Sequence, residues 1–395
     1  MRVVVHDYSG HLCALSLARS LARRGHEVLH LYSASFLTPH GDLQRKEDDP
    51  ETFSVEPVSI GREVDKSDLI KRRQADAAHG HIAARRISEF RPDVVVTANT
   101  PLEAVDRIQV QCRAIGARHV FWVQDLIGVA ADRILREKIP VLGALVGSWY
   151  KGYEQRLLRR SDQAVVISDD FRPFVPVEAS RVHTVENWSP IAEVPVRPKD
   201  NEWSRRNGVA ETTNVVYTGT LGMKHNPGLL VAIAERYKDS PDVRVVVVSE
   251  GASAGWLKEQ ASERRLKNLT VLPFQPAAEL PDVLGSADML VGVLEPAAGV
   301  FSVPSKVLSY LCSGRAILLA VPPENLIARI VGGHQAGIVV PPGDEDGFVA
   351  GAERILSDRE GREQMGRNAR AYAEATFDLE KITDRFETVL EAARA

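Results

Sequence analysis

The sequence is poor in cysteine and contains no long apolar run. Its 395 residues include three cysteines, Cys13, Cys112 and Cys312, whose wide separation matches no metal-binding spacing. Sparse cysteines are typical of a reducing compartment. The N-terminus turns polar after three apolar residues, whereas a secretory leader needs about 7–15, and no stretch approaches the ~18 apolar residues of a spanning helix. We therefore expect a cytoplasmic protein, free or attached to the inner face of the membrane.

The sequence also lacks a basic stripe and the motifs of common cofactor sites. The formal net charge is −4 with charges interspersed, which argues against a nucleic-acid partner. The histidines show no metal-ligand spacing, and no Gly-x-Ser-x-Gly or phosphate-loop Gly-Lys-Ser/Thr motif occurs. The acidic cluster at residues 344–346 follows Pro-Pro-Gly before a helix, which favours helix capping over a metal site. We expect no metal and no organic cofactor.

What the sequence does contain is a repeated strand–helix pattern. Short β-branched runs are continuous rather than alternating, as expected of parallel strands buried on both faces. Strand–helix–strand units with short joints predict an α/β fold with doubly wound parallel sheets. The runs are Arg2–Val5, Val28–Tyr32, Val94–Thr97, Val120–Val123, Ala164–Ser168 and Val182–Val185, then Val215–Thr218, Val243–Val248, Leu269–Leu272, Met289–Val293, Ala316–Ala320 and Ile338–Val340.

A proline-rich stretch divides the two arrays of strands. Asn187–Asp200 contains three prolines and no periodicity, which is typical of a linker. We place the domain boundary there, with one Rossmann-like domain over residues 1–190 and another over 191–376. The last segment, residues 377–395, has apolar residues at helical spacing and is expected to form an amphipathic helix.

The first candidate binding motif joins the first strand of the second domain to a helix. Gly219 and Gly222 allow a tight turn and close approach of a ligand. Asn226 is a good N-cap and Pro227 suits the first helical position, and a helix N-terminus attracts phosphate. Lys224 adds a full positive charge. An ordinary turn with a solvated lysine is the alternative, but the combination favours a diphosphate site.

Three further loops of the same domain follow strands. The loop around Gly299 leads to Ser305, a candidate N-cap, and to Lys306, a second cation for phosphate oxygens. Gly251 could face a nucleoside or form a plain turn. Phe274 could pack against a base or belong to the core. Two helix N-termini with lysines predict a pyrophosphate cradle.

The first domain offers polar residues at two strand ends. Ser9, Gly10 and His11 form a loop with a single glycine, which does not match the dinucleotide-binding pattern and is expected to face a cleft. Gln124 and Asp125 end another strand and lie at the active edge of the sheet. For Asp125, a helix cap is an equally good interpretation.

An apolar stretch at residues 139–150 has two interpretations. It could dip into a membrane surface beside a lipid-linked acceptor, or pack on the first domain as part of a helix. The basic residues that flank it are Arg133, Arg136, Lys138, Lys151 and Arg156.

Taken together, these motifs resemble the retaining glycosyltransferases of family 4, which have the GT-B fold. The bacterial branch that builds colanic acid, O-antigen and other exopolysaccharides is the most similar. The resemblance spans the whole chain and is carried by Asp-Tyr-Ser-Gly-His, Arg-Arg-Gly-His-Glu-Val, Trp-Val-Gln-Asp, Val-Glu-Asn-Trp, Tyr-Thr-Gly-Thr-Leu-Gly-Met-Lys, Val-Ser-Glu-Gly and, most specifically, Val-Pro-Ser-Lys-Val-Leu-Ser-Tyr-Leu-Cys-Ser-Gly-Arg. It implies two domains that face across a cleft, with the last helix packed back on the first.

The resemblance also implies roles for individual residues. The diphosphate would be held by Gly219, Thr220, Gly222, Lys224, Ser305 and Lys306. The nucleoside would lie at Gly251 and Phe274, the sugar at Gly299, Val300, Phe301 and Ser302, and Gly10 would close over the donor. Ser9, His11 and Gln124 would lie on the acceptor side, with Asp125 and Lys224 as catalytic candidates.

Four positions depart from the family pattern. Thr220 replaces an arginine, Phe301 and Ser309 replace a pair of glutamates, and Gln124 replaces a histidine. The second glutamate ordinarily holds the ribose, so Ser309 leaves that contact unassigned.

The reaction implied is metal-free transfer of a sugar, with retention, from a UDP- or GDP-sugar to a hydroxyl of a sugar or lipid-linked glycan acceptor. A nucleotide-sugar 2-epimerase of the same fold is the nearest alternative. It would need carboxylates at the sugar, for which Glu295 is the one candidate. A third interpretation is a homologue of the same fold that has lost catalysis, because Phe301 and Ser309 stand where the family has a pair of glutamates.

Overall fold

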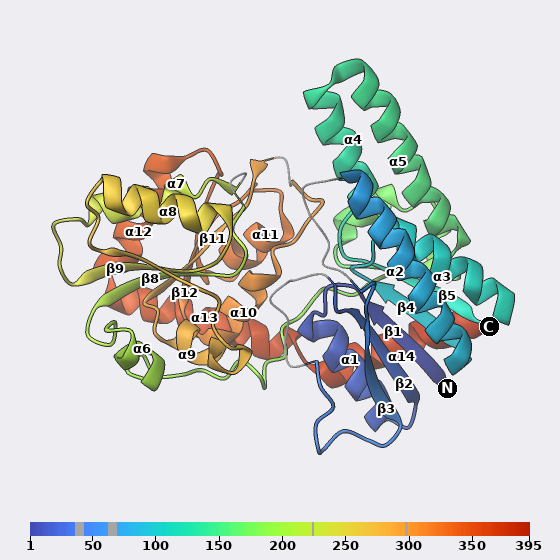
Figure 1. The fold of residues 1–395 in the computed structure, drawn as a ribbon. Helices are drawn as coiled ribbons and strands as arrows, with labels where there is room; N and C mark the ends of the chain where they lie inside the picture. Colours follow the sequence, from blue (N-terminus) through green and yellow to red (C-terminus); the bar gives the residue numbers. More distant parts are fainter. Residues whose placement is uncertain (36–42, 62–68, 223–224, 297–298) are drawn as a thin grey trace. The chain divides into compact units, whose positions relative to one another are not determined.

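The computed structural model describes residues 1–35, 43–61, 69–222, 225–296 and 299–395 (Figure 1). The chain forms two compact units. Unit 1 comprises Met1–Asn187 together with Asp378–Ala395, and unit 2 comprises Trp188–Phe377. Each has its own parallel sheet and its own buried core.

In the described part of unit 1, seven parallel strands form one sheet in the order β3-β2-β1-β4-β5-β6-β7. Val4 of β1 pairs with Leu29 on one side and Val95 on the other, and all three are buried. The predicted doubly wound parallel sheet is therefore confirmed. The strands are β1 Arg2–Asp7, β2 Glu27–Ser33, β3 Phe53–Val58, β4 Val94–Ala98, β5 Arg118–Val123, β6 Gln163–Val166 and β7 Val182–Thr184.

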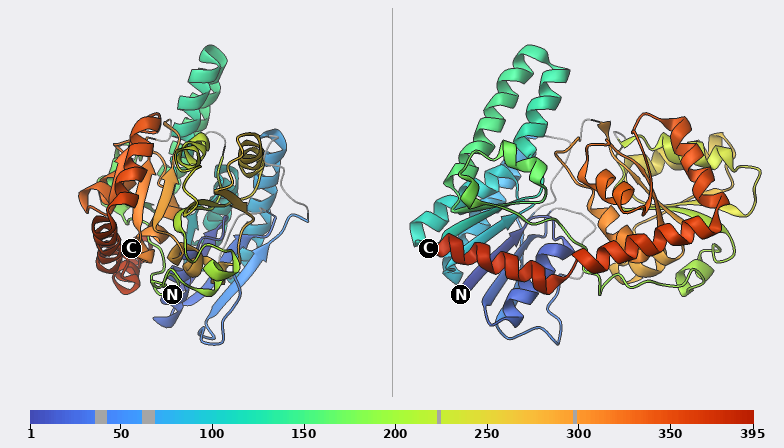
Figure 2. Two further views of the ribbon diagram at one scale, coloured as in Figure 1. Left: turned by 90° about the vertical axis from the view of Figure 1, so that its left-hand side faces the viewer. Right: turned by 180° about the vertical axis from the view of Figure 1, so that it is seen from behind.

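Helices cover both faces of this sheet (Figures 1 and 2). Gly25, with φ +88°, directly follows the C-cap of α1 and stops the helix. The helices of unit 1 are α1 Leu12–Arg23, α2 Leu69–Phe90, α3 Leu102–Ile115, α4 Ile127–Lys138, α5 Pro140–Arg160 and α14 Leu379–Arg394.

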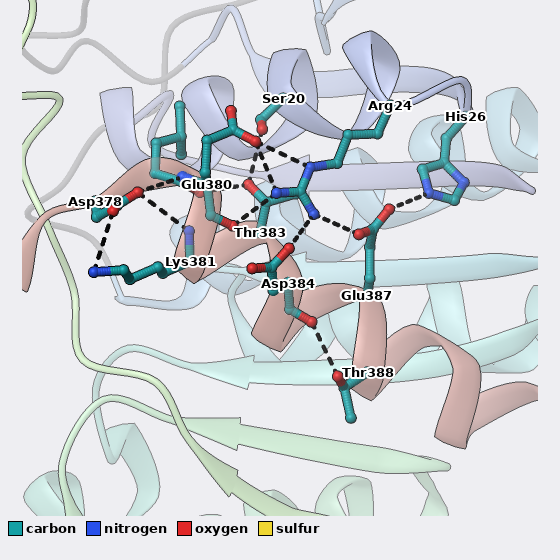
Figure 3. Close-up of polar contacts among 11 residues, drawn as sticks. Ser20, Arg24, His26, Asp378, Glu380, Lys381, Thr383, Asp384, Glu387 and Thr388 are labelled. Atoms are coloured by element: carbon teal, nitrogen blue, oxygen red, sulfur yellow. Dashed lines mark hydrogen bonds and ion pairs between the residues drawn. The ribbon is translucent and has the colours of Figure 1, made fainter.

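Helix α14 brings the C-terminal end of the chain onto α1 and β5. Its buried face includes Phe386, whose ring lies 4.7 Å from that of Trp122. At the edge of this contact the Arg24 guanidinium donates to Glu380 (2.7 Å), Asp384 (2.6 Å) and Glu387 (2.5 Å), as Figure 3 shows. An apolar stripe and a charged rim together fix the helix on unit 1.

In the described part of unit 2, six parallel strands are ordered β10-β9-β8-β11-β12-β13. The strands are β8 Thr213–Thr218, β9 Val243–Val248, β10 Leu269–Leu272, β11 Met289–Val293, β12 Ala316–Ala320 and β13 Gly337–Val340. The helices are α6 Glu202–Arg206, α7 Gly228–Arg236, α8 Ala252–Glu263, α9 Leu280–Gly285, α10 Ser305–Ser313, α11 Leu326–Gly333, α12 Glu345–Ser357 and α13 Arg359–Thr376.

The order of the strands in unit 2 defines where a ligand would bind. The chain runs outward from β8 through β9 to β10, then returns to β11 on the other side of β8. The loops that leave β8 and β11 therefore diverge at their carboxyl ends. In open parallel sheets, ligands bind in the crevice at this reversal.

Candidate functional site

The reversal in unit 2 is lined by the loop after β8 and by helix α10. Gly219 begins that loop with φ +99°, a backbone conformation that side chains other than glycine rarely adopt. A Cβ at this position would lie 3.5 Å from Cε and 3.6 Å from Nζ of Lys306. The loop backbone and this lysine therefore lie side by side, as the sequence predicts for two parts of one site.

Lys306 is held by contacts from β8 and its loop. Its ammonium donates to the Tyr217 hydroxyl and to the Thr220 carbonyl (3.0 Å), and Nζ lies 4.0 Å from the centre of the Tyr217 ring. The Tyr217 hydroxyl itself donates to the Thr220 carbonyl at 2.8 Å. These bonds use two of the three ammonium hydrogens and leave one for a ligand.

The charge of Lys306 is not neutralised within the described part of the chain. Desolvation by burial lowers its pKa from 10.5 to about 7, and no neighbouring carboxylate contributes to that shift. An ammonium in this setting lacks the counter-ion that would offset the loss of water. A bound anion, such as a diphosphate, would supply it.

Tyr310, one turn after Lys306 on α10, fixes the end of β8. Its buried hydroxyl accepts from Thr218 N at 3.0 Å and donates to Thr218 O at 3.3 Å. Burial raises the pKa of Tyr310 to about 12, so the hydroxyl stays protonated. The i, i+4 spacing places both side chains on one face of the helix. Tyr310 was not among the predicted site residues: its i, i+4 spacing from Lys306 was readable in the sequence, but its contact with β8 was not.

A buried asparagine positions the loop before α10. Asn325 Nδ2 donates to the carbonyls of Gly299 (2.6 Å) and Ser302 (2.8 Å), and its Oδ1 caps α11 by accepting from Ile327 N. The loop predicted to contact the sugar, which also includes Val300 and half-buried Phe301, is thus tied to the next helix. The cap position of Asn325 was readable in the sequence, but its reach to this loop was not.

The two loops predicted for the nucleoside are joined to each other. Glu250, next to Gly251, accepts from Phe274 N through its carboxylate at 3.0 Å. Phe274 is half-buried, and a Cβ added at Gly251 would meet no side chain or backbone atom within 4 Å beyond its chain neighbours. Ser309 occupies the position left unassigned for the ribose, and its hydroxyl lies 3.1 Å from that of Ser189.

Two predicted helix caps in this unit are wrong. Helix α7 begins at Gly228 with Pro227 as N-cap, while Asn226 adopts φ +53° outside the helix. Helix α10 begins at Ser305 itself, and its N-cap Pro304 provides no side-chain bond. The third prediction is confirmed, since Asp344 caps α12 by accepting from Gly347 N at 2.8 Å. Gly222 lies in the described part of the β8 loop, whereas Lys224 lies outside the described residues.

In unit 1 the predicted loop after β1 is organised by a buried carboxylate. Asp7 accepts from the backbone N–H groups of Ser9 (3.4 Å) and His11, and its Oδ1 lies 3.6 Å from His11 Nδ1. Burial alone would lower the pKa of His11, but the Asp7 carboxylate outweighs it and raises the pKa. Asn99 also contacts His11 Nδ1, at 2.9 Å. Gly10 completes the turn by donating to Asp7 O at 3.2 Å.

Gln124 and Asp125 follow β5 but have different surroundings. Gln124 is buried and accepts from the Asn187 side chain. Asp125 is exposed at the carboxyl end of the strand. Helix α4 has Leu126 as its N-cap, without a side-chain cap bond, so the capping interpretation of Asp125 is wrong.

Two family models match the chain. Residues 10–188 match the glycosyl transferase 4-like domain, and residues 199–372 match glycosyl transferases group 1. Together they span most of unit 1 and unit 2.

Individual proteins are similar over long stretches. The putative colanic acid biosynthesis glycosyl transferase WcaI of Escherichia coli (strain K12) is 24% identical over 306 residues, which cover 75% of this chain and 73% of the relative. Alpha-D-kanosaminyltransferase of Streptomyces kanamyceticus is 22% identical over 60% of this chain and 61% of its own length. The crystal structure of Anabaena Alr3699/HepE in complex with UDP-glucose has a TM-score of 0.72 at 15% identity and covers 99% of this chain and 100% of its own. The predicted GT-B fold is confirmed.

Proposed function

Because the chain belongs to the family 4 glycosyltransferases, we propose that it transfers a glycosyl group from a UDP-sugar to a hydroxyl of a glycan acceptor. The choice of UDP over GDP rests on the UDP-glucose complex of HepE. The similarity to WcaI supports a place in polysaccharide or glycoconjugate biosynthesis. The observation that carries the proposal is Lys306, a cation without a described counter-ion at the strand reversal of unit 2.

The donor diphosphate would bind between the β8 loop and the first turn of α10. The N-cap Pro304 provides no side-chain bond to that turn, and Val307 N donates to the Pro304 carbonyl at 3.0 Å, so the N–H groups of Ser305 and Lys306 would be the ones to donate to phosphate oxygens. As the glycosidic bond breaks, negative charge grows on the leaving diphosphate. Lys306 and these N–H groups would stabilise the charge where it develops.

We further propose that transfer retains the configuration of the donor sugar and needs no metal. Attack would occur on the face from which the diphosphate leaves, and a phosphate oxygen would accept the proton of the acceptor hydroxyl. No enzymic nucleophile is required for this route. Lys306 would take over the charge neutralisation that a metal ion provides elsewhere. The catalytic roles of Asp125 and Lys224 stay predictions.

A transfer assay with UDP-glucose, UDP-galactose and UDP-N-acetylglucosamine tests the proposal. We expect one donor to give UDP and a glycosylated product when a panel of sugar and lipid-linked acceptors is supplied, with and without EDTA. Incubation with donor alone should leave the sugar unaltered, apart from slow hydrolysis. Conversion of the donor to its 2-epimer without an acceptor would refute transfer as the activity.

A further inference from the structure

Helices α4 and α5 form a hairpin that extends away from the sheet of unit 1 (Figure 1). Glycines on α5 let the two helices approach closely. A Cβ at Gly143 would overlap the Leu135 carbonyl, and one at Gly147 would lie 2.6 Å from the Cα of Asp132. The face of α5 that carries Gly143 and Gly147 therefore packs against α4.

The opposite face of the first half of α5 is apolar and exposed. Val141, Leu145 and Trp149 follow one another at a spacing of four residues, with exposed fractions of 81%, 69% and 53%. Leu142 and Val146 widen this face and are also exposed. The interpretation that residues 139–150 pack on the first domain is therefore wrong for these side chains. We call Val141, Leu142, Leu145, Val146 and Trp149 the apolar face.

Exposed apolar residues are concentrated on this hairpin. Of the nine large hydrophobic side chains that are exposed in the described part of the chain, seven lie between Ile127 and Trp149. A monomeric protein rarely leaves such a contiguous patch in water. We therefore expect another molecule to cover this patch.

The charge of the hairpin indicates what kind of surface it would bind. Residues 127–160 contain seven Arg and Lys against three Asp and Glu, although the whole chain has a net charge of −4. Two of these acids face inward: Glu154 is buried and accepts from Gly128 N, and Asp132 pairs with Arg136 at 2.8 Å. Arg160, at the far end of α5, also pairs with Asp106 of α3 at 3.0 Å, and the remaining charges leave the hairpin with an excess of cations.

We propose that the α4–α5 hairpin docks on an anionic lipid bilayer, with the apolar face among the lipid headgroups and upper acyl chains. Apolar residues with an aromatic ring on one face and cations beside it are the pattern of helices that lie in a membrane interface. No helix in the described ranges is both long and apolar enough to cross a membrane, so the hairpin would rest on the surface.

Vesicle flotation tests this docking without any reference to glycosyl transfer. We expect the protein to float with vesicles of phosphatidylglycerol and phosphatidylethanolamine in equal parts, and not with phosphatidylcholine alone. Binding should weaken as salt screens the cations. The double variant Leu142→Ser/Leu145→Ser should bind about a hundredfold more weakly, since full burial of one leucine is worth about tenfold. Val110→Ser, at an apolar site on α3 that is also more than half exposed, is the control and should bind like the parent protein.

Trp149 provides a direct readout of insertion. Trp122, Trp188 and Trp203 are buried, and the half-buried Trp256 packs against the core of unit 2. Fluorescence quenching by lipids brominated along their acyl chains should therefore report mainly on Trp149 and be largely lost in Trp149→Phe. Equal flotation of the parent and the double-serine variant would overturn the proposal. So would a parent protein that ignores anionic vesicles but sediments as a dimer that the serines dissociate, because the occupant would then be a second copy.

Discussion

UDP binding should be coupled to proton uptake by Lys306, and the affinity should therefore depend on pH in a defined direction. In the free protein, burial lowers the pKa of this ammonium to about 7, so that at pH 9 it is mostly neutral. A bound diphosphate favours the charged form and raises the pKa again. Binding then takes up a proton, and the affinity is highest below pH 7 and falls as the pH rises.

The size of the effect follows from this shift. If the pKa in the complex lies above 9, the dissociation constant for UDP should rise about fiftyfold between pH 7 and pH 9, equivalent to about 2.3 kcal/mol. Isothermal titration calorimetry at several pH values, in buffers with different ionisation enthalpies, measures both the affinity and the proton uptake. Lys306→Met should bind more weakly and lose this pH dependence. Lys258→Met, an exposed lysine on α8, should keep both.

A dissociation constant that stays unchanged from pH 7 to pH 9 in the parent protein would refute the reasoning. The same holds if Lys306→Met retains the full pH dependence, because another group would then bind the proton.

Three further predictions concern stability. Tyr310→Phe leaves Thr218 N without its buried partner, so urea denaturation should show a loss of about 1–3 kcal/mol. Arg24→Gln breaks three partly exposed contacts with α14 and should cost about 1–2 kcal/mol, whereas Arg23→Gln, with one exposed ion pair, should cost less than about 0.5 kcal/mol by the same assay. Acidification should destabilise unit 1, because burial lowers the pKa of His6, His30 and His119 to between about 3 and 4, below the unfolded value of 6.5. The free energy of unfolding should be intact above pH 6.5 and, at pH 5, lower by about 2 kcal/mol for each of these histidines. Chemical denaturation of the parent protein and of His30→Gln measures the effect.

Much of the fold was predictable because the central strands are buried on both faces. Such strands are continuous β-branched runs, and every described strand of unit 2 coincides with one. Strand β3 was missed in unit 1. It lies at the edge of the sheet, is buried only at its two end residues and contains Pro57, so it carries neither the run nor the composition of a central strand.

The site was predictable to the extent that it depends on local chain geometry. The glycine turn after β8 and the lysine at the start of α10 are local features. The contacts from Tyr310 to β8 and from Asn325 to the Gly299 loop join residues distant in sequence, so no periodicity reveals them. The exposure of the apolar face could not be predicted from the sequence either. An apolar helix face ordinarily indicates burial, and only the structure shows that α5 packs on α4 through the opposite face, which carries Gly143 and Gly147.

A crystal structure of the protein with UDP tests the central claim most directly. We predict that diphosphate oxygens lie within hydrogen-bonding distance of Lys306 Nζ, above the Gly219 turn and at the first turn of α10. Unit 2 also has a basic cavity of about 740 Å³ near the amino ends of its strands, lined in part by Lys199, Arg315 and Arg362. UDP bound in that cavity, with Lys306 free of phosphate, would contradict the account.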